Sequence, residues 1–165
     1  MTGLDKVREQ VVLFLQGVGI SAVAAWENAN QNVGETPVVA VAVQSCESGS
    51  AGFLDYLGEG QNPLTGRWEE RYGRRMRLTL SLDIYCKKNL GGGALQQGFD
   101  ALAQALQTAP IPGLSVTGFS RGETKFEAQW GLLHCPAELK CEAYFYAVAD
   151  EGGQFADFEI KGVKA

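Results

Sequence analysis

Two stretches of the sequence alternate strictly between apolar and polar residues, and this alternation constrains the fold more than any other feature. The first covers residues 76–86 and the second covers residues 139–147. Successive side chains of a strand point to opposite faces, so a period of two predicts a strand with one buried and one polar face. In the first stretch the apolar residues are Met76, Leu78, Leu80, Leu82, Ile84 and Cys86.

Two other stretches carry apolar residues at helical spacing. The first begins with Thr2 and Asp5, which resemble a capping box, and glycines at 17 and 19 end it. The second follows a break at residues 89–93 and stops at Pro110 and Pro112. The apolar faces consist of Val7, Val11, Phe14, Leu15 and Val18, and of Leu95, Phe99, Leu102, Ala103 and Leu106.

Shorter segments between these elements predict further strands. They cover residues 20–27, 38–43, 114–119, 125–130 and 155–163, and a polar turn region fills residues 28–37. The regular βαβ alternation of a doubly wound fold is missing. We therefore expect one α+β domain over residues 1–165, with a single mixed, mainly antiparallel sheet packed by two amphipathic helices.

Periodicity disappears between residues 47 and 73, where glycines, Pro63 and charged residues are interspersed with single aromatic residues. A stretch of this length without regular structure is usually functional or mobile. We expect a long, extended hairpin arm projecting from the domain. Its aromatic residues Phe53, Tyr56 and Trp68 either fold back as a small satellite core or anchor a partner, because Tyr, Trp and Arg dominate interface hot spots.

Basic residues are concentrated at the end of this arm and along the strand after it. Residues 67–88 contain seven basic and three acidic side chains, a net charge of +4, which leaves −9 for the rest of a chain whose total is −5. Such an asymmetry can steer one copy onto another, although it also suits a soluble sheet edge or a local nucleic-acid contact. The candidate interface residues are Phe53, Tyr56, Arg67, Trp68, Arg71, Arg74, Arg75 and Arg77.

Charge and composition exclude several classes of protein. A pI of about 4.9 argues against binding nucleic acid over the whole surface, which needs many basic side chains. The charged N-terminal residues lack the apolar core of a signal peptide, and no apolar run approaches the length of a membrane span. The four cysteines form no C-x-x-C pair, so we expect reduced, intracellular and mostly buried thiols.

Few residues suggest chemistry. His134 stands beside Cys135, but neighbours in a strand point to opposite faces, so a catalytic pair is not favoured. The three glycines at 91–93 precede a helix without the spacing of a phosphate-binding loop. The adjacent carboxylates Glu69 and Glu70 lack any surrounding motif, as do Asp150 and Glu151. We expect no catalytic, cofactor-binding or metal-binding residue.

Several segments together resemble a family of phage proteins. They are F-L-D-Y-L-G-E (53–59), P-L-T-G-R-W-E-E-R-Y-G (63–73), L-D-I-Y-C (82–86), G-F-D-A-L-A-Q-A-L (98–106), R-G-E-T-K-F-E (121–127) and C-P-A-E-L-K-C-E-A-Y-F-Y-A (135–147). The order of a charged arm, an amphipathic strand, a glycine-led helix and terminal strands is similar to that of tail terminator, or tail completion, proteins of prophages in Gram-positive bacteria.

The resemblance implies a structural role without catalysis. Tail terminators form a closed ring, usually a hexamer, that caps the tail tube and joins it to the head. The implied partners are further copies of the chain, the tail tube protein and the head–tail connector, with DNA only passing through the lumen. The implied locations are the host cytoplasm during assembly and the virion tail. Two alternatives stay open: a head–tail connector or other minor tail protein, and a small cytosolic enzyme or ligand-binding domain using Cys135 and His134.

Overall fold

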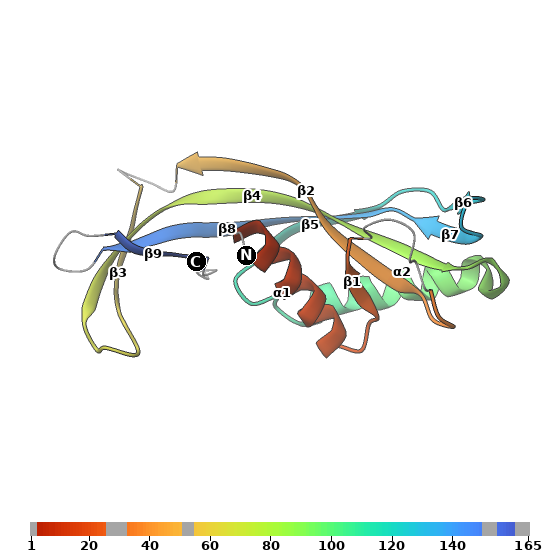
Figure 1. Ribbon diagram of the computed structural model, residues 1–165, viewed down its shortest axis with the longest axis horizontal. Coiled ribbons are helices and arrows are strands. Elements are labelled where there is room, and N and C mark those ends of the chain that lie inside the picture. Colours follow the sequence, from red (N-terminus) through yellow and green to blue (C-terminus); the bar gives the residue numbers. More distant parts are fainter. Residues whose placement is uncertain (1–2, 26–32, 51–54, 150–154, 161–165) are drawn as a thin grey trace.

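The computed structural model describes residues 3–25, 33–50, 55–149 and 155–160 (Figure 1). Two helices and nine strands are formed by these residues. In chain order they are α1 (Gly3–Gly17), β1 (Ala22–Ala24), β2 (Val38–Ser50), β3 (Tyr56–Gln61), β4 (Trp68–Lys87), a 3-10 turn (Lys88–Leu90), α2 (Gly91–Thr108), β5 (Ser115–Arg121), β6 (Lys125–Glu127), β7 (Leu132–Cys135), β8 (Ala137–Ala149) and β9 (Phe155–Ile160).

All nine strands belong to one mixed sheet built around β4. Strand β4 pairs with β2, β3, β7 and β8, while β1, β5, β6 and β9 extend the sheet from these neighbours. Only the pairing of β1 with β2 is parallel, and every other pairing of the described strands is antiparallel. The predicted α+β class, with a mixed and mainly antiparallel sheet and two helices, is therefore confirmed.

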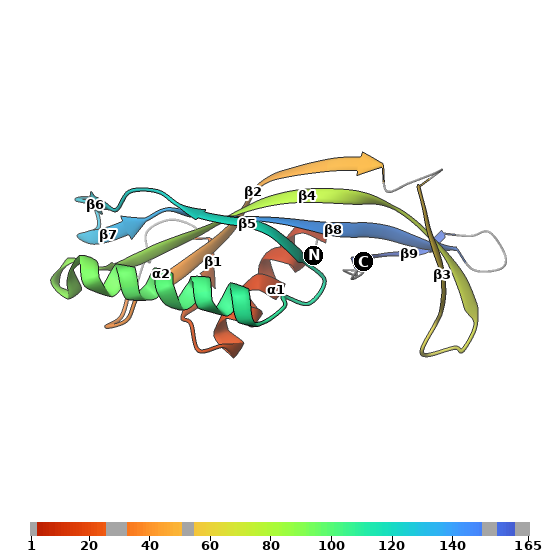
Figure 2. The ribbon, with the colours of Figure 1, turned by 180° about the vertical axis from the view of Figure 1, so that it is seen from behind.

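Both helices lie on the same side of the sheet (Figures 1 and 2). Helix α1 contacts β1 and β2, whereas α2 contacts β4 and β7. The helices are short relative to β4, since the 20 residues of β4 span about 66 Å at ~3.3 Å per residue. The 18 residues of α2 span only about 27 Å at 1.5 Å per residue. A large part of the sheet therefore extends beyond its helical cover.

The main core lies where the helices cover β4. Its apolar alternation from Leu78 to Cys86 faces the helices and is fully buried. Deletion of such a side chain removes favourable burial and leaves a cavity, so these residues dominate the stability. The core consists chiefly of Val7, Val11 and Leu15 of α1, Leu95 and Leu102 of α2, Val39 and Val41 of β2, Leu78, Leu80, Leu82 and Ile84 of β4, and Leu139 and Cys141 of β8.

Helix α2 approaches the loop before β2 closely at Gly98. A Cβ atom at this position would lie 3.2 Å from Cβ of Pro37 and 3.5 Å from Cγ2 of Ile84.

A second, smaller cluster occupies the opposite face of the sheet, where Tyr85 packs with Val33, Val38, Ala40 and Leu132. Both faces are thus buried at this end of β4.

The predicted elements differ from the structure mainly at their boundaries. The strand expected at 38–43 continues to Ser50, and the strand expected at 76–86 begins at Trp68, because pairing with β4, β2 and β8 stabilises residues that lack an apolar pattern. The strand expected at 20–27 has only three residues, Ala22–Ala24, within the described part of the chain. Strand β7 was not predicted, since four residues are too few to show alternation.

The long arm expected between residues 47 and 73 is not confirmed as a separate element. Residues 47–50 are the end of β2 and residues 68–73 are the beginning of β4, and these two segments pair with neighbouring strands of the main sheet. Only β3, the connecting turn and the first residues of β4 form a hairpin of their own. This β3–β4 hairpin is a bent extension of the central sheet.

Neither helix of the described residues combines the length and apolar character needed to cross a bilayer.

Replacing a core leucine with alanine tests the position of the core. Leu80→Ala should lower the free energy of unfolding by about 2–5 kcal/mol, because Leu80 is fully buried. Leu64→Ala is the matched control and should change it by less than about 0.5 kcal/mol, because Leu64 lies at the tip of the β3–β4 hairpin and is 94% exposed. Urea denaturation of both variants measures the difference, and equal losses would contradict the assignment.

Candidate interaction surface

The tip of the β3–β4 hairpin is held by hydrogen bonds centred on Asn62. The Asn62 N–H donates to the carbonyl of Arg67 at 2.8 Å, and the Asn62 carbonyl accepts from the N–H of Gly66 at 2.8 Å. The Asn62 side chain caps the turn, since its Oδ1 accepts from the N–H groups of Leu64 at 2.8 Å and Thr65 at 3.2 Å. Asparagine is favoured in turns because its side chain makes such bonds. The turn is therefore ordered by its own polar groups.

This ordered tip presents large apolar side chains to solvent. Leu64 is 94% exposed and Trp68 is 63% exposed. Tyr56 is 42% exposed and packs against Tyr72 across the hairpin, with ring centroids 5.4 Å apart and ring planes at 58°. Tyr56 thus has a partner within the hairpin, while Leu64 and Trp68 are more exposed than Tyr56. Phe53, the remaining aromatic residue of the predicted interface, lies outside the described residues.

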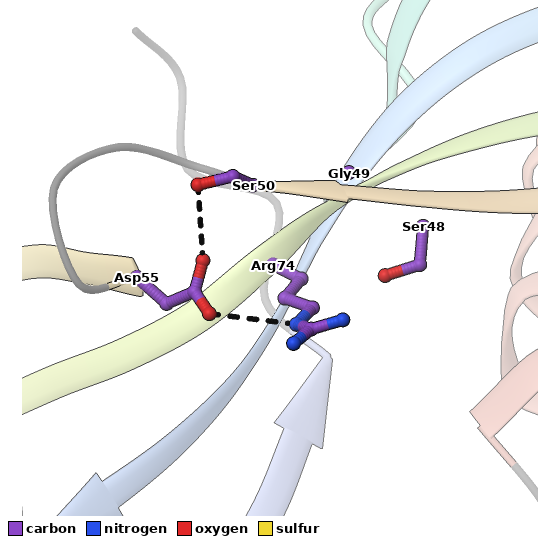
Figure 3. Close-up of a pocket in the computed structure, with 5 residues that line it drawn as sticks. All are labelled: Ser48, Gly49, Ser50, Asp55 and Arg74. Carbon is purple, nitrogen blue, oxygen red and sulfur yellow. Dashed lines mark hydrogen bonds and ion pairs between the residues drawn. The ribbon is translucent and has the colours of Figure 1, made fainter.

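Asp55 orders the beginning of β3, where the hairpin leaves the sheet (Figure 3). Its φ of 57° lies in the left-handed region, and it is the one described non-glycine residue with a positive φ. Its carboxylate accepts a hydrogen bond from Oγ of Ser50 at 3.2 Å and lies 3.4 Å from Nε of Arg74. With Ser48 and Gly49 these residues line a shallow polar hollow of about 280 Å³. The contacts fix the hairpin relative to β2 and β4.

Arg71 lies against the backbone of its own hairpin. A Cβ atom at Gly60 would stand 2.6 Å from the guanidinium carbon of Arg71, so a larger residue there would displace the end of the arginine side chain. Gly58 has a φ of 109° beside the irregular pairing of β3 with β4, which also favours glycine. The glycines of this segment therefore shape the hairpin.

The predicted basic residues are distributed along β4 and do not form one patch. Arg67 lies at the hairpin tip, whereas Lys87 lies at the other end of the strand. Arg77 Nε lies 3.5 Å from Oε1 of Glu142, and Lys87 Nζ lies 2.8 Å from Oε1 of Glu35. Both pairs are accessible to solvent on at least one side, so each adds little to stability. They nevertheless neutralise part of the predicted positive field within the same chain.

His134 lies between two carboxylates on the face of the sheet opposite the helices. Its Nε2 is 3.4 Å from Oδ1 of Asp83 on β4, and its Nδ1 is 3.3 Å from Oε1 of Glu127 on β6. The imidazole also stacks on Tyr85, with ring centroids 4.5 Å apart and planes at 7°. Asp83 raises the pKa of His134 above its usual 6.5; burial acts in the opposite direction, and Glu127 adds to the rise. This cluster joins β4, β6 and β7.

Cys135 and His134 do not form a catalytic pair. They are neighbours in β7, and alternation directs Cys135 into the main core while His134 contacts the carboxylates of the opposite face. Cys135 is fully buried, and its Sγ lies 3.9 Å from the carbonyl oxygen of Gly122. Among the other three cysteines, burial raises the pKa of Cys46, Cys86 and Cys141, the last to about 12, which disfavours their thiolates at neutral pH.

A groove of about 660 Å³ runs between the end of α2 and the beginning of β5. Its wall includes Val116, which is 38% exposed, and one acidic side chain, Glu142 of β8. Other lining residues are Leu106, Pro110, Ile111, Pro112 and Tyr144. The groove is open, and about half of its lining is apolar, so it offers an accessible apolar surface.

Leu64 and the groove were not among the predicted site residues. Leu64 has no aromatic ring and lies in a polar turn, so composition gave no reason to select it. The Asn62–Pro63 sequence followed by Gly66 indicates a turn, and an apolar residue inside such a turn is the one available signal. The groove brings together residues 106–116 with 142–144, and sequence spacing does not predict that contact.

The chain was compared with models of known protein families and with the curated proteins, and neither comparison found a match. Within residues 3–25, 33–50, 55–149 and 155–160 there is also no group of three or more His, Cys, Asp or Glu side chains arranged to hold a metal ion.

His134 should titrate above its usual pKa of 6.5. Since it is the single histidine of the chain, its imidazole signals in proton NMR are assigned directly. Asp83→Asn should lower this pKa, because it removes the carboxylate that contributes most. Because the folded pKa is the higher one, the resulting stabilisation is complete below pH 6.5 and is lost as pH rises through the folded pKa.

The control for this pH dependence is His134→Gln, whose unfolding free energy should lack this decrease between pH 6.5 and the folded pKa. A folded pKa below 6.5 would contradict the proposed contacts.

Cys46 should be the thiol that reacts first in the native protein, because it is partly exposed while Cys86, Cys135 and Cys141 are buried. In a colorimetric thiol assay, one equivalent should react before global unfolding, and Cys46→Ser should abolish that phase. A second thiol that reacts within seconds at neutral pH would indicate an activated cysteine and would favour the enzyme alternative.

Proposed function

We propose that this chain is a structural subunit of phage tail assembly, of the tail terminator type, which forms a ring on the tail tube. The observation that carries the proposal is the ordered β3–β4 hairpin, which exposes Leu64 and Trp68 at the end of a sheet that its helices do not cover. A solvent-exposed apolar pair on a rigid turn is a feature of protein interfaces, where apolar and aromatic anchors provide most of the binding energy. The sequence resemblance supplies the biological setting.

The geometry gives little support to catalysis by the described residues. Both nitrogens of His134 face carboxylates of the same chain, and Cys135 lies in the core. The hollow beside Asp55 is shallow and polar. Another hollow, of about 310 Å³, is formed by β2, β4, β5 and β8 and is lined largely by polar side chains such as Glu47, Arg77 and Lys140. The described residues therefore favour a role in binding other proteins over a role in catalysis.

A ring needs two different surfaces on each subunit, because each copy contacts its two neighbours through opposite faces. The hairpin lies at one end of the elongated sheet, and the C-terminal end of α2 with the α2–β5 connection forms a distinct surface (Figure 2). The net charge of −5 suits a lumen through which DNA moves without binding. The same surfaces would serve a head–tail connector, which would bind the head vertex in place of the tail tube.

Light scattering coupled to size-exclusion chromatography tests the proposal. The native chain should form a closed oligomer, either alone or after addition of tail tube protein. A variant in which Asn-Gly replaces residues 61–68 should stay monomeric, because the shortened turn keeps the pairing of Gly60 with Glu69 and removes the exposed tip. Its circular dichroism and unfolding midpoint should match those of the native chain.

A native chain that stays monomeric at every concentration, with and without tail tube protein, would overturn the proposed function. Assembly on portal or connector proteins without binding to the tail tube would favour the connector role.

A further inference from the structure

We propose that the tip of the β3–β4 hairpin of one copy inserts Leu64 into the groove between α2 and β5 of a second copy. The inference deepens the proposed function, on which it rests, by assigning the two surfaces of the contact. One surface is convex and apolar at its apex, and the other is concave and half apolar.

The shapes of the two surfaces match in scale. The groove has a volume of about 660 Å³, within the range of roughly 300–1,000 Å³ that binding pockets occupy. It is too large for a single side chain, and a turn that brings Pro63 and Leu64 together would fill more of it. Ile111 is buried in the main core and Val116 is partly exposed, so the groove combines a fixed apolar base with an accessible wall.

The charges of the two surfaces are complementary. Arg67 is exposed beside Leu64 at the tip, and Glu142 is the one charged residue that lines the described groove. Glu142 already lies 3.5 Å from Arg77 of its own chain, so an incoming arginine would join an existing pair. Oppositely charged groups at the rim of an apolar contact fix its orientation and speed association.

The tip is also preorganised for insertion. The Asn62 side chain and the backbone bonds of the turn hold Leu64 in place before any partner is present. A turn that is already ordered loses less conformational entropy on binding than a mobile loop does. The groove walls are the end of a helix and the beginning of a strand, so both surfaces are supported by regular structure.

One copy does not satisfy its own groove through this contact. The hairpin bends to the helix side of the sheet, and in both views its tip stands apart from the C-terminal end of α2 and from the α2–β5 connection (Figures 1 and 2). Each copy therefore offers a tip to one neighbour and a groove to another. Such a heterologous contact repeats around a ring when the rotation between copies closes.

Charge substitution in each surface tests the contact. Leu64→Asp and Val116→Asp should each raise the dissociation constant between copies at least tenfold, because each places a carboxylate in an apolar contact beside Glu142. Leu13→Asp is the matched control, since Leu13 of α1 is 67% exposed and lies outside both surfaces. Analytical ultracentrifugation measures association under the condition in which the native chain assembles.

Cross-linking then identifies the partner surface. In a Cys46→Ser background, Leu64→Cys chains mixed with Val116→Cys chains should form a disulfide-linked heterodimer under mild oxidation. Leu13→Cys chains mixed with Val116→Cys chains should not. A double variant carrying both cysteines should yield links between chains and few within a chain.

Each other outcome has a definite meaning. If the native chain assembles and Leu64→Asp assembles equally well, the contact is wrong while the proposed function stands. If Leu64→Asp prevents assembly, but Val116→Asp assembles like the native chain and no disulfide-linked heterodimer forms, the tip binds another surface and the groove assignment is wrong. If the native chain never associates, the proposed function fails and the contact fails with it.

Discussion

The difference in length between β4 and the helices determines how the rest of the molecule is arranged. A strand of 20 residues is more than twice as long as a helix of 18 residues, so the helical layer covers only one part of the sheet. In the covered part, the alternate side chains Leu78, Leu80, Leu82, Ile84 and Cys86 are buried between the sheet and the helices. In the uncovered part the same strand carries Arg74, Arg77 and Trp68, whose side chains are exposed to solvent.

That uncovered part is ordered by polar contacts in place of a core. Asp55 joins Ser50 and Arg74, Asn62 closes the hairpin turn, and Arg71 packs over Gly60. Each of these contacts is weak alone, yet together they fix the direction of the hairpin. Apolar groups can therefore remain at the tip without folding back, and such groups are available to a partner.

Local patterns predicted the elements better than their ends. Alternation around Leu80 and Leu139 and helical spacing around Val11 and Leu102 gave the two long strands and both helices, because burial on one face imposes those periods. The continuation of β2 and β4 into polar residues was missed, because it depends on cross-strand pairing and carries no apolar signal. Of the candidate interface, Trp68 and Arg67 are exposed at the hairpin, whereas Arg74 and Arg77 are engaged with Asp55 and Glu142.

The sequence by itself determined the α+β class and the buried face of each long element, because these follow from the spacing of apolar residues along the chain. It also placed Cys135 and His134 on opposite faces of any strand that contains both. Only the tertiary structure decided which strands pair, where helical cover stops and which apolar residue stands free at the hairpin tip. These depend on contacts between residues far apart in the chain, such as Arg77 with Glu142, and no local pattern encodes their register.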